Sequence, residues 1–237
     1  MKTIVKLLLP VLMTTGLPSF HCAAQDWPNL NCYRNDNQSL WEARHNDPDD
    51  ACKNWVVFMG NSITQNWASM DPEFFARNNY IGRGISGQTS PQMLLRFRQD
   101  VIELAPKAVV ILAGTNDIAG NTGPSSIDMI MDNIISMAQL ARANDIRVVL
   151  CSVLPANRYK WAPDVKPADT IIELNRQIKA YAEANQMVYV DFHTALVDKE
   201  KGLSAAYGAD GVHPTLDGYK IMESLVVKGI EQALSIQ

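Results

Sequence analysis

The sequence predicts an α/β protein in which a parallel sheet lies between two layers of helices. Short apolar runs recur along the chain, and each is typical of a strand that is buried on both faces. Between these runs lie longer stretches whose apolar residues are spaced by three or four, as on one face of a helix. Strands that alternate with helices pair in parallel through right-handed crossovers, so both patterns together favour three layers. The 237 residues show no internal repeat and no sign of a second domain.

Five runs carry the strand pattern, and four stretches carry the helix pattern. The strands are expected at Val56–Met59, Tyr80–Gly82, Ala108–Ala113, Arg147–Val153 and Val188–Asp191. The helices are expected at Pro91–Leu104, Pro124–Ala143, 168–185 and Leu216–Leu234. A five-stranded parallel sheet of this kind predicts a flavodoxin-like, three-layer sandwich that occupies residues 55–237.

The first 24 residues are expected to be a cleaved signal peptide, with export to the periplasm or the extracellular space. Lys2 and Lys6 give a basic start, an apolar stretch follows, and Cys22-Ala-Ala supplies the small residues that a peptidase needs. The apolar stretch is too short to span a membrane. The alternative is a lipid anchor on Cys22, although His21 does not fit the small residue that usually precedes such a cysteine.

The charge of the remaining chain argues against a nucleic-acid partner. Residues 25–237 hold all 25 acidic residues and 19 of the 21 basic ones, which gives a formal net charge of -6. No basic run and no interleaving of basic with aromatic residues occurs. No spacing of cysteine and histidine resembles a zinc site. The sequence leaves the oligomeric state open.

Residues 25–54 are expected to form an irregular N-terminal extension that wraps the domain. The stretch is rich in Asn, Asp and Trp and shows little periodicity. We expect its tryptophans, Trp27, Trp41 and Trp55, to pack against the domain as anchors. The spacing of Cys32 and Cys52 permits a disulfide in an oxidising compartment without requiring one. Cys151 lies inside an apolar run and is expected to be a buried small side chain.

A serine follows the first predicted strand directly. The run Trp55–Met59 ends at Gly60, and Asn61 and Ser62 come next, before a less regular segment that begins at Ile63. Ligand crevices of open α/β sheets lie at the C-terminal ends of their strands. Ser62 is therefore a candidate nucleophile.

Two further segments follow predicted strands and supply possible hydrogen-bond donors. Gly82-Arg-Gly-Ile-Ser-Gly87 is a glycine cluster that leaves backbone N–H groups exposed, although it is equally compatible with a plain turn. It also resembles a phosphate loop, but the Lys-Ser/Thr ending of that motif is absent. Gly114-Thr-Asn-Asp117 follows the third strand and places the Asn116 amide where it can donate to an oxyanion, or simply form an Asn turn.

A histidine and a carboxylate lie three residues apart just before the last helix. In Asp210-Gly-Val-His213, an aspartate that accepts a hydrogen bond from one imidazole nitrogen leaves the other nitrogen free as a base. The alternative is a helix-entry turn with an incidental histidine. Asp191 and His193, two residues apart at the end of the last strand, form a rival pair.

Taken together, these blocks resemble the SGNH hydrolase family, also called GDSL-type esterases and lipases. The blocks are Gly60-Asn-Ser-Ile63, the glycine at Gly84, Gly114-Thr-Asn-Asp117 and Asp210-Gly-Val-His213, and the resemblance spans residues 55–235.

The resemblance implies a role for each matching residue. Ser62 would be the nucleophile, His213 the general base and then acid, and Asp210 the residue that orients His213. The backbone N–H groups of Ser62 and Gly84 and the Asn116 amide would form the oxyanion hole. No cofactor is implied. The family's usual first block has Asp where this chain has Asn61, so we expect the turn to survive with altered local electrostatics, the alternative being an inactive relative.

The sequence favours a short acyl group, above all acetyl, on a carbohydrate. No extended apolar lid segment is visible, and Arg83, Arg158 and Trp161 are candidate substrate-binding residues. Arg83 is equally suited to pair with a carboxylate, and Trp161 to pack in its loop. Other activities stay open: a lysophospholipase, an acetylhydrolase of the platelet-activating-factor type, a thioesterase, or a glycan-binding protein without catalysis.

Overall fold

A five-stranded parallel sheet forms the centre of the molecule, as predicted. The computed structural model describes residues 25–46, 54–208 and 210–236. The strand order is β2-β1-β3-β4-β5, and all neighbouring pairs are parallel. The strands are β1 (Val56–Gly60), β2 (Tyr80–Gly84), β3 (Ala108–Ile111), β4 (Arg147–Cys151) and β5 (Val188–Val190). β2 extends to Gly84, two residues beyond its expected end.

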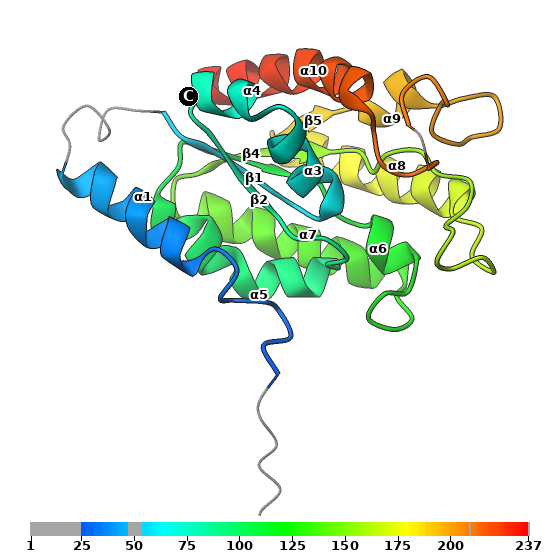
Figure 1. Ribbon diagram of the computed structural model, residues 1–237, viewed down its shortest axis with the longest axis horizontal. Helices are drawn as coiled ribbons and strands as arrows, with labels where there is room; N and C mark the ends of the chain where they lie inside the picture. The colour runs from blue at the N-terminus through cyan, green and yellow to red at the C-terminus, as the bar shows by residue number, and fades with distance from the viewer. Residues whose placement is uncertain (1–24, 47–53, 209, 237) are drawn as a thin grey trace, which may run out of the picture.

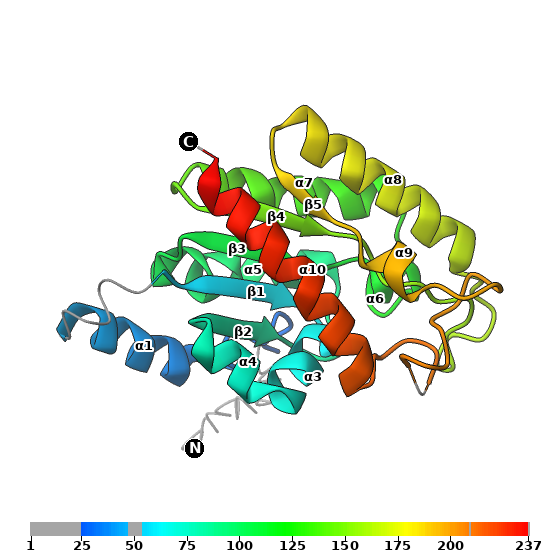
Figure 2. The same ribbon diagram turned by 90° about the horizontal axis from the view of Figure 1, so that it is seen from above.

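Helices cover both faces of the sheet, which makes a three-layer sandwich (Figures 1 and 2). One layer holds α5 (Ser90–Asp100), α6 (Thr115–Ile118), α7 (Ile127–Arg142) and α8 (Ala168–Ala184). The opposite layer holds α3 (Ser62–Met70), α4 (Pro72–Arg77), α9 (Phe192–Leu196) and α10 (Leu216–Ser235). The four predicted helices are confirmed as α5, α7, α8 and α10. The first of them ends earlier than expected, and a 3-10 turn (Ile102–Leu104) follows it.

The strands are apolar on both faces because each face packs against a helical layer. Along β1, Val57 and Met59 point into the core beneath α5 and α7, whereas Val56 and Phe58 point to the core beneath α3 and α10. All four side chains are at most 2% exposed. Burial on both sides explains why these strands appear in the sequence as continuous apolar runs rather than as alternating patterns.

The N-terminal segment is more regular than expected. Residues Arg34–Asn46 form a helix, α1, that packs against α5 and the turn that follows it, so the prediction of an irregular extension is wrong there. The helix has no apolar stripe to reveal it. Leu40 packs against the core, and polar contacts add to this, because Asn37 Nδ2 donates to Asp100 Oδ1 over 2.7 Å. Trp55 is buried as predicted, but Trp27 and Trp41 are 42% and 45% exposed and are not packed anchors.

Some expectations lie outside the described residues. The signal peptide of residues 1–24 and the lipid anchor at Cys22 do, and so does any disulfide of Cys32, because Cys52 is not described. Cys151 is buried in β4, as predicted. Among the helices of the described ranges, none combines the length and the apolarity that crossing a membrane requires.

Candidate active site

Ser62 lies at the first position of helix α3, directly beyond the end of β1. The sequence predicts a less regular segment there, but Ser62–Met70 is helical. Asn61 caps the helix, and its Oδ1 accepts the Ile63 N–H over 3.0 Å. This is the local bond expected of Asn61 in place of an aspartate, so the turn survives the change. A residue at this position also has a backbone N–H without a partner inside the helix.

The structure brings Ser62, His213 and Asp210 together in one hydrogen-bonded chain. Ser62 Oγ lies 2.9 Å from His213 Nε2, and His213 Nδ1 lies 2.7 Å from Asp210 Oδ2. An ionised carboxylate only accepts, so Nδ1 carries the hydrogen of a neutral imidazole and Nε2 accepts from the serine hydroxyl. The His213 and Asp210 side chains are 28% and 40% exposed, which leaves this chain open to a substrate.

The local backbone keeps Asp210 ionised. Burial by itself raises the pKa of a carboxyl group, but here hydrogen bonds outweigh it and hold the pKa of Asp210 below its usual value. Asp210 Oδ1 accepts the backbone N–H of His213 over 2.8 Å and that of Val212 over 2.9 Å. The carboxylate therefore fixes both the turn and the ring of His213.

The rival pair Asp191 and His193 is not assembled. Asp191 caps α9 instead, and its two oxygens accept the Thr194 backbone N–H over 2.9 Å and the Thr194 hydroxyl over 2.7 Å. His193 Nε2 is buried and has no hydrogen-bond partner among the described residues. Burial lowers the pKa of His193, although the nearby charge of Asp191 opposes this.

Gly84 is placed where its N–H cannot serve an oxyanion at Ser62, so this expectation is wrong. Gly84 is the last residue of β2 and pairs with Gly60 of β1. The next N–H, that of Ile85, donates to the Gly60 carbonyl of β1. Successive residues of a strand direct their N–H and carbonyl groups to opposite sides. Gly84 therefore directs its N–H and its carbonyl to the outer edge of the sheet, where the Tyr33 hydroxyl donates to the carbonyl.

Gly87, on the loop after β2, is better placed. Ser86 holds this loop beside α3, because its N–H and its hydroxyl donate to Gln65 Oε1 over 2.8 and 2.7 Å. Gly87 adopts a φ of +79°, a conformation that favours glycine. Among the described residues, no hydrogen bond uses the N–H of Gly87 or that of Ser62. The position of this glycine could have been found from the end of the strand. The strand is expected to end at Gly82, but β2 ends at Gly84, so Gly87 is the glycine that lies in the loop.

Asn116 reaches the same loop from the end of β3. It is 3% exposed, and its Nδ2 donates to the Gln88 carbonyl over 2.9 Å. An amide nitrogen carries two hydrogens, so one remains for another acceptor. The N–H groups of Ser62 and Gly87 and the amide of Asn116 are thus three donors on adjoining segments at the C-terminal edge of the sheet.

Arg83 does not reach this site. Its side chain is 3% exposed, and Nη2 forms an ion pair with Asp36 Oδ2 over 2.6 Å. Nε donates to Asn37 Oδ1 over 2.9 Å, and the guanidinium lies over the Tyr33 ring. The sequence left two roles open for Arg83, and the structure shows that it pairs with a carboxylate. The prediction that it binds substrate is wrong. Arg83 ties the N-terminal segment to β2.

Arg96 of α5 stabilises the segments that carry the site, and the sequence analysis did not identify it. Its side chain is fully buried, and Nη2 donates to the carbonyls of Gly60 and Arg83 over 2.9 Å each. Nε donates to Gln88 Oε1 over 2.6 Å, and Nη1 pairs with Asp100 Oδ2 over 2.9 Å. One guanidinium thus joins the ends of β1 and β2 to the loop that holds Gly87.

The loop after β4 carries the two other candidate substrate-binding residues. Trp161 is 47% exposed and lines a cavity of about 610 Å³ beside the loop of Gly87. Arg158 is exposed on the same loop but is not among the residues that line this cavity. The structure therefore brings Trp161, but not Arg158, to a hollow next to the donors.

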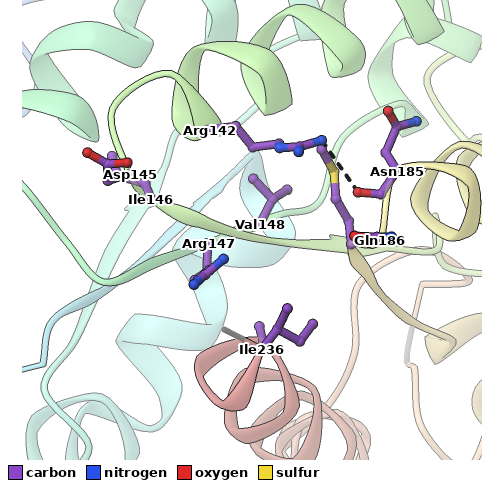
Figure 3. Close-up of a pocket in the computed structure, with 10 residues that line it drawn as sticks. Arg142, Asp145, Ile146, Arg147, Val148, Asn185, Gln186 and Ile236 are labelled. Atoms are coloured by element: carbon purple, nitrogen blue, oxygen red, sulfur yellow. Dashed lines mark hydrogen bonds between the residues drawn. The ribbon is translucent and has the colours of Figure 1, made fainter.

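Another cavity, of about 340 Å³, lies at the opposite edge of the sheet (Figure 3). Its walls come from the end of α7, the start of β4, the segment before β5 and the end of α10, and include Arg142, Arg147, Asn185 and Ile236. Parallel strands place their N-terminal ends away from Ser62, so this cavity is no part of the site. Among the described residues, no group of three or more His, Cys, Asp or Glu side chains is arranged to hold a metal ion.

Comparison with known proteins places the chain among acylhydrolases. The model of the GDSL-like lipase/acylhydrolase family matches residues 58–221. Esterase TesA of Pseudomonas aeruginosa is 30% identical over 167 residues, which cover 67% of this chain and 74% of the esterase.

Two solved structures agree over most of the chain. A GDSL-like lipase from Bacteroides thetaiotaomicron is 48% identical, with a TM-score of 0.81 over 87% of this chain and 98% of the other. A proposed acylhydrolase from Bacteroides fragilis is 47% identical, with a TM-score of 0.84 over 89% of this chain and 100% of the other. The protein therefore belongs to the GDSL-like lipase/acylhydrolase family and is a carboxylic ester hydrolase.

Proposed function

We propose that the protein is a serine esterase that removes short acyl groups, above all acetyl, from carbohydrates through an acyl-enzyme. The observation that carries this proposal is the chain from Ser62 Oγ through His213 to Asp210, with distances of 2.9 and 2.7 Å. A serine hydroxyl that donates to a neutral imidazole is the arrangement needed to activate a weak nucleophile.

In the first half of the reaction, Ser62 Oγ attacks the ester carbonyl while His213 Nε2 accepts the hydroxyl proton. The carbonyl oxygen becomes an oxyanion and accepts from the N–H groups of Ser62 and Gly87 and from the Asn116 amide. The tetrahedral intermediate collapses, the bond to the alcohol oxygen breaks, and the proton on His213 passes to the leaving alcohol. The acyl group then remains on Ser62 as an ester.

In the second half, water replaces the alcohol. His213 takes a proton from the attacking water, which adds to the acyl-enzyme carbonyl, and the same donors hold the second oxyanion. Collapse releases the carboxylic acid and returns the proton to Ser62. Asp210 stays ionised throughout, and it stabilises the imidazolium that forms at each transfer.

The surroundings of the site support a small acyl group and a hydroxylated alcohol. The cavity beside the Gly87 loop is lined by amides, hydroxyls and two indoles rather than by a continuous apolar wall. Trp161 on its rim offers an exposed aromatic surface. If the protein is exported, as residues 1–24 predict, it meets glycans outside the cytoplasm.

The test is hydrolysis of p-nitrophenyl esters with acyl chains of about 2 to 12 carbons by the wild type and by Ser62→Ala. We expect rapid release from the acetate, a decline with longer chains, and loss of turnover in the variant. A maximum at long chains would move the protein to lysophospholipase-like activity, and preference for an acyl thioester would indicate a thioesterase. No turnover together with glycan binding would indicate a binding protein.

A further inference from the structure

We propose that Trp27 and Trp161 form a binding subsite for a sugar ring of the ester substrate, on the alcohol side of the bond that is cleaved. The inference rests on the proposed esterase activity and adds to it the N-terminal segment as part of the binding surface. Both indoles line the cavity of about 610 Å³ beside the Gly87 loop, and they are 42% and 47% exposed. Its volume lies within the range of small-molecule sites, roughly 300–1,000 Å³.

The indole of Trp161 is held in place rather than free to turn. Its ring stacks on Tyr159, with ring centroids 5.0 Å apart and planes 27° from parallel, and Tyr159 is only 1% exposed. Its Nε1 donates to Asn121 Oδ1 over 2.9 Å. One face of the indole is covered by a buried residue, so the exposed part of the ring is a rigid platform on the cavity.

Trp27 is carried to the cavity by a segment that is itself anchored. Gln92 Nε2 donates to the Trp27 carbonyl and Gln88 Nε2 to the Pro28 carbonyl, each over 2.7 Å. Asp26 accepts the N–H groups of Leu30 and Asn31 and closes the turn that follows. These bonds fix the backbone around Trp27 while its side chain stays exposed.

A short chain of hydrogen bonds links the subsite to the donors of the active site. Asn121, which accepts from Trp161, also donates through Nδ2 to the Gly87 carbonyl over 3.0 Å. The next carbonyl, that of Gln88, accepts from Asn116. Gly87 and Gln88 both line the cavity. A group bound there therefore lies against the same loop that offers the Gly87 N–H to the oxyanion.

The lining favours a neutral, hydroxylated ring over other ligands. Among the described residues that line the cavity, Asp26 is the one that carries a charge and none is Lys, Arg or His, which disfavours phosphate-bearing headgroups. Asn29, Gln92 and Thr122 supply amide and hydroxyl groups next to the two indoles. Aromatic platforms combined with a few polar groups suit the apolar face and the hydroxyl edge of a pyranose ring.

The test compares acetylated oligosaccharides with p-nitrophenyl acetate, which lacks a sugar. A panel of acetylated xylo-, manno- and gluco-oligosaccharides identifies the sugar ester with the highest kcat/KM. The selectivity is then the ratio of that value to kcat/KM for p-nitrophenyl acetate. We expect this ratio to fall about tenfold in Trp27→Ala and in Trp161→Ala, which corresponds to about 1.4 kcal/mol.

Trp41→Ala is the matched control, because Trp41 is 45% exposed and lines a different cavity, against α5. It is expected to keep the wild-type ratio. A wild-type ratio in both Trp27→Ala and Trp161→Ala would overturn the subsite. So would Ser62-dependent hydrolysis of p-nitrophenyl acetate without turnover of any sugar ester. Absence of Ser62-dependent turnover on every ester would instead overturn the proposed esterase mechanism.

Discussion

Arg96 Nη2 lies 2.9 Å from the carbonyl oxygen of Gly60, two residues before Ser62. The same nitrogen donates to the Arg83 carbonyl, so a single buried cation closes the ends of β1 and β2 together. Arg96 of α5 therefore stabilises the turn that carries Ser62. Asp100, 1% exposed, balances this charge, and Asn37 of α1 donates to it in turn.

Removal of the Arg96 guanidinium should weaken both the fold and the nucleophile turn. Arg96→Met leaves Asp100 buried without its cation, and we expect a loss of about 3–5 kcal/mol in the free energy of unfolding, measured by urea denaturation. Arg96→Lys keeps a charge but loses the fork that holds two carbonyls. It should lower kcat for p-nitrophenyl acetate without raising KM to the same extent. Wild-type kcat in Arg96→Lys would show that the hydrogen bonds of Arg96 to the Gly60 and Arg83 carbonyls do not position Ser62.

Ser62 and His213 should act as a unit. Ser62→Ala and His213→Ala are each expected to lower kcat by about 10⁴- to 10⁶-fold, and the double variant should be no slower than the worse single one. The reason is that His213 acts as a base on the Ser62 hydroxyl, and this hydroxyl is a weak nucleophile without that base. Steady-state kinetics on p-nitrophenyl acetate measures this. A double variant slower by the product of the two single effects would mean that the residues contribute independently.

Loss of the Asn116 amide should lower kcat more than loss of the Asn121 amide, although both amides donate to carbonyls of the same loop. Asn116→Ala removes one of the proposed donors to the oxyanion, and a loss of about 100- to 1,000-fold in kcat is typical of such a change. Asn121→Ala removes only the anchor on the Gly87 carbonyl, so kcat for p-nitrophenyl acetate should fall far less. Equal losses in the two variants would indicate that Asn116 acts only by holding the loop.

His193 should make the folded state more sensitive to acid. Its buried ring has a lowered pKa in the folded protein, whereas the unfolded chain titrates near its ordinary value, about 6.5. As the pH falls below that value, the unfolded state binds the proton first, so stability declines until the lower folded pKa is passed. His193→Gln should reduce the loss of unfolding free energy between pH 7.5 and 5.5, measured by urea denaturation. An unchanged pH dependence would contradict this.

The sheet and the main helices were predictable because their signals are local. Runs such as Val56–Met59 are apolar throughout, since both faces of the sheet are covered, and α7 and α10 show the spacing of a half-buried helix. The candidate chain of Ser62, Asp210 and His213 was predictable for a related reason. Each residue follows a strand or precedes a helix, and the topology brings such positions to one edge.

The rest depends on contacts between distant segments. α1 is a polar helix stabilised by Asp100, which lies more than 60 positions from Asn37 in the sequence. The two roles of Arg83 stayed open because its partner, Asp36, lies 47 positions away in the sequence. The choice between Gly84 and Gly87 turned on where β2 ends, a boundary that residue types alone define poorly.

Labelling with a fluorophosphonate, followed by peptide mass spectrometry to locate the adduct, shows whether Ser62 is the nucleophile. We expect one adduct per chain, on Ser62, with esterase activity lost in proportion to labelling and no labelling in Ser62→Ala. A protein that keeps its esterase activity after complete exposure to the reagent, or that carries the adduct on another serine, would contradict it.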